Sequence, residues 1–387
     1  MGRTAALPVL PLVAVAAACW SAVMATSQSR GRPSASIDHL VPPRHFAKAP
    51  PERHATGVVG AVGSIDAAAF GVRADGRSDD TLALQSAISA AAGAATVLLP
   101  AGTMVVTRPL MLETSSQWAP GLKLQGQGKG VTVLDNRVAN GACIVARSTT
   151  LYHFQLGGWI THLTINASTH APNSSGISVE AVYNFHVDSV QIDGLSGDGM
   201  TNTNHHMDGD GAVELQLTNS WVSNNAGYGF NSDFGMCTYT DQGKPINGCK
   251  ANVQSSFATF KNNYFAGNGN GTKPAVRYMG LQGTFQGNGF TTNRGGGLLV
   301  DYGGSNNAQL TMIDNDFENN GYPSLNIRSV IAARIIGTGI AQTVWKEFPS
   351  TGGIVVGNQG IAMPKWQVIY NLVFQDTYLT EQRNTKL

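Results

Sequence analysis

One six-residue pattern recurs six times, and it constrains the fold more than any other feature of this sequence. Each copy has a small polar residue first, an apolar residue third, and an asparagine or aspartate last. The copies are THLTIN (161–166), DSVQID (188–193), SWVSNN (220–225), NYFAGN (263–268), NGFTTN (288–293) and NDFENN (315–320). The shortest spacings, 25 and 27 residues, match one coil of a solenoid of parallel strands. The repeat therefore predicts stacked coils with the third position inside and the asparagines stacked at the turns.

The segment before the repeat predicts a helix and a pair of strands. Thr81 to Ala92 is expected to be helical, with Asp79 or Asp80 accepting hydrogen bonds from its free N–H groups, and Leu84, Ile88 and Ala91 on one face. The stretch TVLLPAGTMVV then predicts a strand, a Pro-Ala-Gly turn and a second strand.

Four short motifs in this segment carry a family resemblance. They are Phe70-Gly71, Asp75-Gly76, Asp79-Asp80 and Pro100-Ala101-Gly102, with the helix between the last two. This order resembles the entry of the pectate-lyase-like superfamily, which includes pectate lyases, polygalacturonases and tailspike-like proteins. The resemblance implies an all-β fold, a single-stranded right-handed parallel β-helix with an N-terminal capping α-helix. Such a cap covers the open strand edges of the first coil. The motifs build the cap and imply no particular chemistry.

The N-terminus has the pattern of an export signal. Residues 1–25 contain Arg3, an apolar run and small residues before a cleavage site after Ala25, so we expect a secreted, periplasmic or cell-surface protein. Lipidation at Cys19 and an uncleaved anchor are the alternatives. Residues 26–60 are rich in proline and basic residues and predict a disordered linker, which leaves 61–387 as the β-helix domain.

Charge and cysteine usage narrow the function further. The net charge is +1 and only 13% of residues are charged, so there is no basic field for nucleic acid. In an oxidising compartment, we expect Cys237 and Cys249 to form a disulfide that closes one loop. Cys143, within the apolar stretch ACIV, is expected to be a buried free thiol.

A second column of the repeat predicts a polar stripe. Four glycine–apolar pairs look equivalent, and each is expected to begin a strand: Gly176-Ile177, Gly199-Met200, Gly229-Phe230 and Gly297-Leu298. The fourth residue after each glycine would lie on one face of successive coils. These residues are Glu180, Thr203, Asp233 and Asp301. Arg277 is expected close to this stripe, although its coil does not fit the pattern cleanly.

Two coils are too long and must carry loops. The spacing is 32 residues from Asp188 to Ser220 and 43 residues from Ser220 to Asn263. The excess is expected to leave the coils at Asn204 and Phe234, with a smaller excursion after Asp301. Because coils stack, these loops should line one side of the column and form a groove suited to an extended polymer.

The first loop contains the stretch NTNHHMDGDG, which has several candidate metal ligands. Asp208, Asp210 and Glu214 could offer oxygens to Ca²⁺, but the spacing is too short for the twelve-residue calcium loop. His205 and His206 are adjacent, which is poor zinc geometry. We therefore predict no cofactor, with calcium as the alternative.

Glycoside hydrolysis is one chemistry that the groove could host. It requires two carboxylates, about 5–5.5 Å apart for retention or about 6.5–9.5 Å apart for inversion. Asp208 and Asp210 could face one way, and Asp233 is expected beside them. Asp233 and Asp301, two coils apart, would be separated by about 9.6 Å.

A polysaccharide lyase is the second chemistry. It requires a cation to neutralise the sugar carboxylate and a base to remove a proton. Lys244, Lys250, Arg277 or Arg294 could supply the cation, and His206, Tyr239 or a lysine the base. The family's polygalacturonase motifs are not reproduced, since the nearest pieces are NTN (202–204) and ARIIG (333–337), and the Asp-Pro-His motif of mannuronan epimerases is absent.

The sequence therefore predicts an exported β-helix protein that cleaves a polysaccharide as a lyase or glycoside hydrolase. The predicted catalytic residues are His206, Asp208, Asp210 and Asp233, and the predicted substrate-binding residues are Tyr239, Lys244, Arg277 and Asp301. The alternative is a non-catalytic glycan-binding or tailspike-like β-helix. In that reading the loop 202–211 is a solvated turn, and Asp233 and Asp301 form a salt ladder with Arg277 and Arg328.

Overall fold

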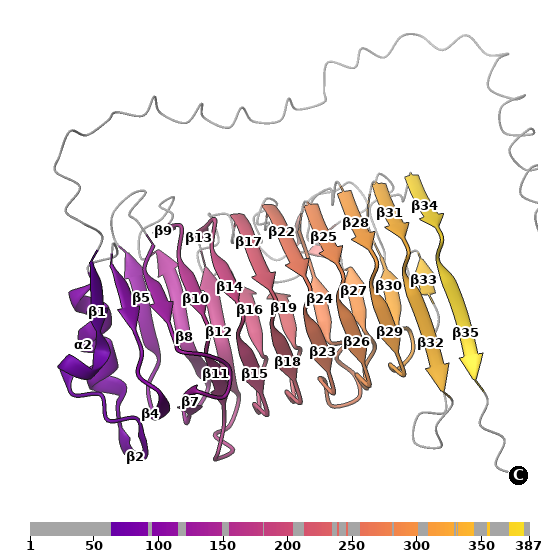
Figure 1. Cartoon of the computed structure of the whole chain (residues 1–387). Coiled ribbons are helices and arrows are strands. Elements are labelled where there is room, and N and C mark those ends of the chain that lie inside the picture. Colours follow the sequence, from indigo (N-terminus) through magenta and orange to yellow (C-terminus); the bar gives the residue numbers. More distant parts are fainter. Residues whose placement is uncertain are drawn as a thin grey trace, which may run out of the picture. The chain divides into compact units, whose positions relative to one another are not determined.

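A computed structural model shows the architecture of the chain (Figure 1). It describes residues 63–91, 95–114, 121–148, 155–180, 182–203, 213–233, 238–239, 245–246, 256–280, 282–300, 309–328, 330, 332–343, 354–356 and 371–382. The described residues all lie in the second of the chain's two units, Gly60–Leu387. The predicted signal segment 1–25 and linker 26–60 lie outside the described residues. Within the described residues no helix is long and apolar enough to span a membrane.

The second unit is a right-handed parallel β-helix, as predicted. Each coil except the first and the last contributes one strand to each of three parallel sheets, which we call sheets 1, 2 and 3 in the order that the chain visits them. Successive coils stack from the indigo N-terminal end to the yellow C-terminal end in Figure 1. Right-handed crossovers are the rule for connected parallel strands.

Sheet 1 is the longest of the three. Its ordered path is β1 (Ser64–Asp66), β3 (Thr96–Leu98), β6 (Lys123–Gln125), β10 (Trp159–Thr161), β14 (His186–Asp188), β17 (Val213–Thr218), β22 (Ser256–Lys261), β25 (Gln282–Gln286), β28 (Gln309–Ile313), β31 (Ala332–Ile336) and β34 (Asn371–Gln375). Two short strands lie off this path, β9 (Gln155–Leu156) and β13 (Val182–Tyr183).

Sheets 2 and 3 complete the coils. Sheet 2 contains β2 (Asp75–Asp79), β4 (Gly102–Val106), β7 (Thr132–Asn136), β11 (Thr164–Asn166), β15 (Gln191–Asp193), β18 (Trp221–Ser223), β23 (Tyr264–Ala266), β26 (Gly289–Thr291), β29 (Asp316–Glu318), β32 (Gly339–Thr343) and β35 (Tyr378–Gln382). Sheet 3 contains β5 (Leu110–Thr114), β8 (Gly141–Ser148), β12 (Ser174–Glu180), β16 (Met200–Thr203), β19 (Phe230–Asp233), β24 (Val276–Tyr278), β27 (Leu298–Val300), β30 (Leu325–Ile327) and β33 (Ile354–Val356). A separate antiparallel hairpin pairs β20 (Thr238–Tyr239) with β21 (Pro245–Ile246).

The N-terminal end carries the predicted cap. It consists of the 3₁₀-helix η1 (Ala67–Phe70) and the helix α2 (Thr81–Ala90), whose residues Leu84 and Ile88 are buried against the first coils. Asp79, not Asp80, is the aspartate whose side chain forms a hydrogen bond with the first turn of the helix. Its Oδ1 accepts the N–H of Thr81 at 3.0 Å.

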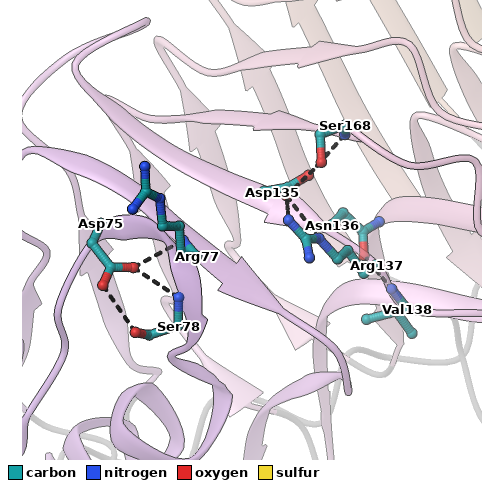
Figure 2. A network of polar contacts seen from close by, with 8 residues as sticks. All are labelled: Asp75, Arg77, Ser78, Asp135, Asn136, Arg137, Val138 and Ser168. Atoms are coloured by element: carbon teal, nitrogen blue, oxygen red, sulfur yellow. Dashed lines mark hydrogen bonds and ion pairs between the residues drawn. The ribbon is translucent and has the colours of Figure 1, made fainter.

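Aspartates also hold the turns next to the cap. The Asp80 carboxylate accepts the N–H groups of Arg73 and Ala74 instead of capping the helix. Asp75 accepts the N–H groups of Arg77 and Ser78 at 2.8 and 2.7 Å (Figure 2). These backbone hydrogen bonds from Ser78 and Arg77 lower the pKa of Asp75 to about 2.

Two asparagine ladders hold the turns on either side of sheet 2. The first asparagine ladder comprises Asn263, Asn288 and Asn315, and the second comprises Asn225, Asn268, Asn293 and Asn320. In each ladder the side-chain N–H donates to the side-chain oxygen of the next coil, for example Asn293 to Asn320 at 2.8 Å. All seven side chains are buried. Buried amides are tolerated here because the ladder satisfies both their donors and their acceptors.

The inward column between the ladders is partly as predicted. Phe265, Phe290 and Phe317 stack with ring centroids 5.3 and 4.5 Å apart, and Val222 precedes them in register. The first two copies of the pattern were assigned two residues out of register, because Ile165 and Ile192, not Leu163 and Val190, pair with this column. A strand repeats every two residues, so this shift leaves the same face inward and the pattern cannot detect it.

Cys143 is buried in the core and its thiol is free, as predicted. Burial raises the pKa of this thiol far above its ordinary value. The side chain therefore acts as a small apolar core residue.

Candidate functional site

The two predicted insertions leave the same edge of sheet 3. Strand β16 ends at Thr203 and β19 ends at Asp233, as expected from the long coils. The chain next enters sheet 1 at Val213 and at Ser256, and these two strands are neighbours as well. Both insertions therefore connect sheet 3 to sheet 1 on adjacent coils.

The predicted stripe has the predicted register. Ile177 pairs with Met200, Met200 with Phe230, and Phe230 reaches Leu298 through Val276. Thr203 pairs directly with Asp233, so these two positions lie one coil apart on the outer face.

Arg277 lies close to the predicted stripe but not at its level. Arg277 pairs with Asn231 and Leu299, two residues before the level of Asp233. The reason is that Val276 occupies the position that follows a glycine in the other coils. Arg277 still belongs to the outward-facing positions of sheet 3, because a two-residue shift preserves the face.

Most of the other predicted site residues lie outside the part of the chain that the structure describes. These are His206, Asp208, Asp210, Lys244 and Asp301, together with the predicted disulfide partners Cys237 and Cys249. For Asp233 and Tyr239 the structure describes the strand but not the side chain. The predicted catalytic roles, the disulfide and the calcium alternative therefore stay predictions.

Sheet 3 has a hollow of about 520 Å³ on its outer face. Its lining comes from β5, β8, β12 and β16, and includes Met111, Arg147, Ser175, Ser178, Glu180 and Thr201. The hollow thus lies on the four coils that lead to the first insertion. We call this hollow and the adjoining strand ends up to Asp233 the sheet 3 groove.

A charged row forms one side of this groove. Glu113, Arg147 and Glu180 are paired in register on β5, β8 and β12, one residue per coil. The Arg147 guanidinium contacts Glu113 Oε1 through Nε and Nη2, each at 2.6 Å. Glu180, on the other side of Arg147, is only 2% exposed. Stacked strands about 4.8 Å apart place the two glutamate backbones about 9.6 Å from each other.

A second polar cluster lies at the beginning of the next strands of sheet 3, β16, β19 and β24. Asp198 accepts the N–H of Tyr228 at 2.9 Å and the side-chain N–H of Asn231 at 3.2 Å. Lys273 Nζ is 3.9 Å from Asp198 and lies over the Tyr228 ring. Gly227 is required here, because a Cβ at this position would be 2.0 Å from Asp198 Oδ1.

Ionisable groups also lie at the beginning of the sheet 1 strands β13, β14 and β17, the last of which follows the first insertion. Tyr183 donates to Glu214 Oε1 at 3.2 Å, and burial, followed by this carboxylate, raises the pKa of the tyrosine. Burial lowers the pKa of the nearby His186, against the opposing effect of Asp188 and Glu214. His186 is therefore biased toward the neutral form, which can accept a proton.

The sequence interpretation missed Glu113, Arg147, Asp198 and Lys273. A signal for Arg147 exists in GACIVARS, where the inward Ile144 and Ala146 alternate with the outward Val145 and Arg147. It lies before the first copy of the repeat, so the repeat alone does not reach it. Within the described residues no group of three or more His, Cys, Asp or Glu is placed to hold a metal.

Comparisons with known proteins give one family match. The family model described as rhamnogalacturonase A/epimerase, pectate lyase-like, matches residues 64–296. No curated protein matches the sequence.

Several solved structures are similar to the chain. ORF18 of Geobacillus virus E2 is 15% identical, with a TM-score of 0.47 over 84% of this chain. The match spans 62% of that viral protein's length. The A-module of the Azotobacter vinelandii mannuronan C-5 epimerase AlgE4 is 18% identical, with a TM-score of 0.45 over 83% of this chain and 97% of that one. An alginate lyase from Paenibacillus sp. is 12% identical, with a TM-score of 0.43 over 81% of this chain and 98% of that one.

Proposed function

The chain belongs to the rhamnogalacturonase A/epimerase, pectate-lyase-like family, and from this premise we propose that it is an exported enzyme that cleaves a polysaccharide in the sheet 3 groove. The family description names enzymes of carbohydrate polymers, which supports this class of substrate. A parallel β-helix also suits a polymer, since each coil can contact a further part of an extended chain.

The observation that carries the proposal is the charged row beside the insertions. Glu113, Arg147 and Glu180 lie on three consecutive coils and line the hollow or border it. The next coils bring Thr203 and Asp233 to the positions where both insertions leave the sheet. Carboxylates and a guanidinium thus follow the groove along its length, as recognition and proton transfer on a polar polymer require.

Hydrolysis and elimination would use these groups differently. In a hydrolase, Glu180 and Asp233 would be the acid and base, because their backbones are two coils, or about 9.6 Å, apart, near the upper end of the inverting range. In a lyase, Arg147 or Arg277 would neutralise a sugar carboxylate while a base removes the proton. Asp208, Asp210 and His206 in the first insertion are further candidates for acid or base.

One observation favours the non-catalytic alternative. Arg147 is already paired with Glu113 at 2.6 Å, and Glu180 is buried beside it. A row in which each charge has a neighbour of opposite sign stabilises a sheet face without any chemistry. The second candidate function is therefore a glycan-binding or tailspike-like β-helix.

Product analysis distinguishes the two candidates. The purified chain is incubated with polygalacturonate, rhamnogalacturonan and alginate, and both new reducing ends and ultraviolet absorbance of an unsaturated sugar are measured. Reducing ends with the absorbance identify a lyase, and reducing ends without it a hydrolase. Folded protein without product on every polymer would contradict the enzyme proposal.

Two variants and a control test whether Glu180 and Asp233 form the catalytic site. We expect Glu180→Gln and Asp233→Asn each to lower kcat about 100-fold or more, because acid–base groups contribute about that factor. Glu318→Gln removes an exposed carboxylate on sheet 2 and is expected to leave kcat unchanged. Equal activity in all three variants would place the chemistry elsewhere.

A further inference from the structure

Two exposed aromatic rings lie side by side on the outer face of sheet 2. Trp221 on β18 is 53% exposed and Tyr264 on β23 is 43% exposed. The two residues are paired in register, so they occupy one outward row on neighbouring coils. The row belongs to a different sheet from the sheet 3 groove.

The next residue in this row is a glycine, and it leaves space for the tyrosine ring. Gly289 pairs with Tyr264, and a Cβ on Gly289 would be 3.0 Å from Cδ2 and 3.4 Å from Cε2 of the ring. The Cδ2–Cε2 edge of the Tyr264 ring therefore occupies the space that a side chain at position 289 would need. Lys129 Nζ lies 4.8 Å from the Trp221 ring centroid. We call Lys129, Trp221, Tyr264 and Gly289 the aromatic platform.

The surroundings of the platform are polar, which argues against a protein partner. Gln191 precedes Trp221 in the row, and the next outward row contains Ser223, Ala266 and Thr291. A protein interface requires a contiguous apolar core, whereas here two ring faces are bordered by amide and hydroxyl groups. A sugar ring has the complementary surface, with C–H groups on its face and hydroxyls at its rim.

Cations lie beside the platform, and carboxylates lie further along the same rows, at Asp316 after Gly289 and at Asp193 before Ser223. Lys129 and Lys261 are exposed, and neither forms an ion pair with any carboxylate of the described residues. The Lys129 ammonium donates to the Asn219 carbonyl at 3.1 Å, which holds it beside Trp221. Beyond the ends of the sheet 2 strands, a hollow of about 610 Å³ is lined by Arg294, His170 and Asn270 among others. The two lysines that lack a carboxylate partner among the described residues are the groups with which an anionic ligand would pair.

We propose that the aromatic platform is a second, non-catalytic binding surface for an acidic polysaccharide. Its sugar rings stack on Tyr264 and Trp221, and its carboxylates pair with Lys129 and Lys261, while Arg294 extends the contact into the adjoining hollow. The choice of a polysaccharide rests on the proposed function; the location of the surface does not. Such a surface would hold a long polymer on the protein independently of turnover in the sheet 3 groove.

Affinity electrophoresis in gels that contain sodium polygalacturonate tests this directly. The parent is expected to be retarded in that gel but not in a gel that contains neutral dextran. The double variant Trp221→Ala/Tyr264→Ala is expected to bind about tenfold more weakly, whereas Trp221→Phe/Tyr264→Phe, which keeps both rings, should stay within about threefold of the parent.

Trp159→Ala is the matched control. Trp159 is also an exposed tryptophan with a lysine over its ring, Lys123 at 5.9 Å, but it lies on sheet 1. This variant should be retarded like the parent. Circular dichroism and the melting temperature of each variant establish that the coils are intact.

The outcomes separate the platform from the groove. The platform is supported if Glu180→Gln is retarded like the parent and the double alanine variant is not. This holds whether or not the polymer is cleaved. Cleavage of the polymer with equal retardation of the parent and the double alanine variant overturns the platform and leaves the groove proposal standing. An unretarded parent, or an equal loss in Trp159→Ala, also overturns it.

Discussion

Replacing Asn293 by alanine removes the centre of the second asparagine ladder. Asn293 Nδ2 donates to the Phe265 carbonyl at 2.9 Å and to Asn320 Oδ1 at 2.8 Å. Asn293 Oδ1 accepts the Asn268 N–H at 2.9 Å and the Asn268 side-chain N–H at 3.3 Å. Four hydrogen bonds are lost in a site that water does not reach, since the side chain is fully buried.

The expected cost follows from those four contacts. At about 1 kcal/mol of net stability for each hydrogen bond, Asn293→Ala should lower the free energy of unfolding by about 4 kcal/mol. For a domain of this size that corresponds to a melting temperature about 8 °C lower. Asn270→Ala is the matched control, because Asn270 is an exposed asparagine of the adjacent turn and should change stability by less than about 0.5 kcal/mol.

Thermal unfolding followed by circular dichroism measures the difference, and urea unfolding gives the corresponding midpoint. Asn293→Asp adds a second check, because it keeps the shape but replaces the donor by a carboxylate that repels Asn320 Oδ1. It should destabilise at least as much as alanine at neutral pH. If Asn293→Ala melts within about 1 °C of Asn270→Ala, the ladder does not stabilise the coils.

Two further perturbations test other contacts. Gly227→Ala should lower the free energy of unfolding by about 1–3 kcal/mol, because its Cβ would lie 2.0 Å from Asp198 Oδ1; an unchanged melting temperature would contradict this. Asp135 is desolvated, which raises its pKa, but hydrogen bonds from Ser168 and Arg137 lower it below the ordinary 3.8 (Figure 2). Its stabilising contribution is therefore present above pH 3.8 and is lost as the pH falls through the lower, folded-state value. Asp135→Asn should cost about 2 kcal/mol at neutral pH and should flatten the acid loss of stability; an equally steep acid loss would contradict the assignment.

The coils were predictable from the sequence because their side chains repeat with the coil. Asn263, Asn288 and Asn315 are identical residues in one ladder, and Phe265, Phe290 and Phe317 form one stack, so the pattern and the structure share one period. The coils of the first two copies have no asparagine at either ladder position, where Leu163 and Ser168 or Val190 and Leu195 stand instead, and the pattern then fits equally well two residues away. The asparagine pair fixes the register, and the apolar face alone does not.

The site was predictable only in part, for a related reason. The lengths of the coils located both insertions, and the glycine column located Glu180, Thr203 and Asp233. The column could not place Arg277, because its coil has Val276 without the preceding glycine. Glu113 and Arg147 were missed because they precede the first copy of the repeat. How residues within an insertion are arranged does not follow from a coil period, since an insertion leaves the coil.

The turns of the fold explain why a groove and a flat platform would occur on different faces. Between sheets 1 and 2 the chain turns in two residues, the first with positive φ and the second buried, as at Asn219-Ser220 and Asn262-Asn263. The hydrogen bond from the Ser220 N–H to Asn263 Oδ1 ties this turn to the next coil, which leaves no room for added residues. Insertions are accommodated between sheets 3 and 1 instead, and there they can flank a groove with many side chains. A surface beside the two-residue turn has no insertion, so it can recognise a ligand only with the outward side chains of its strands. Aromatic rings with nearby cations are suited to that.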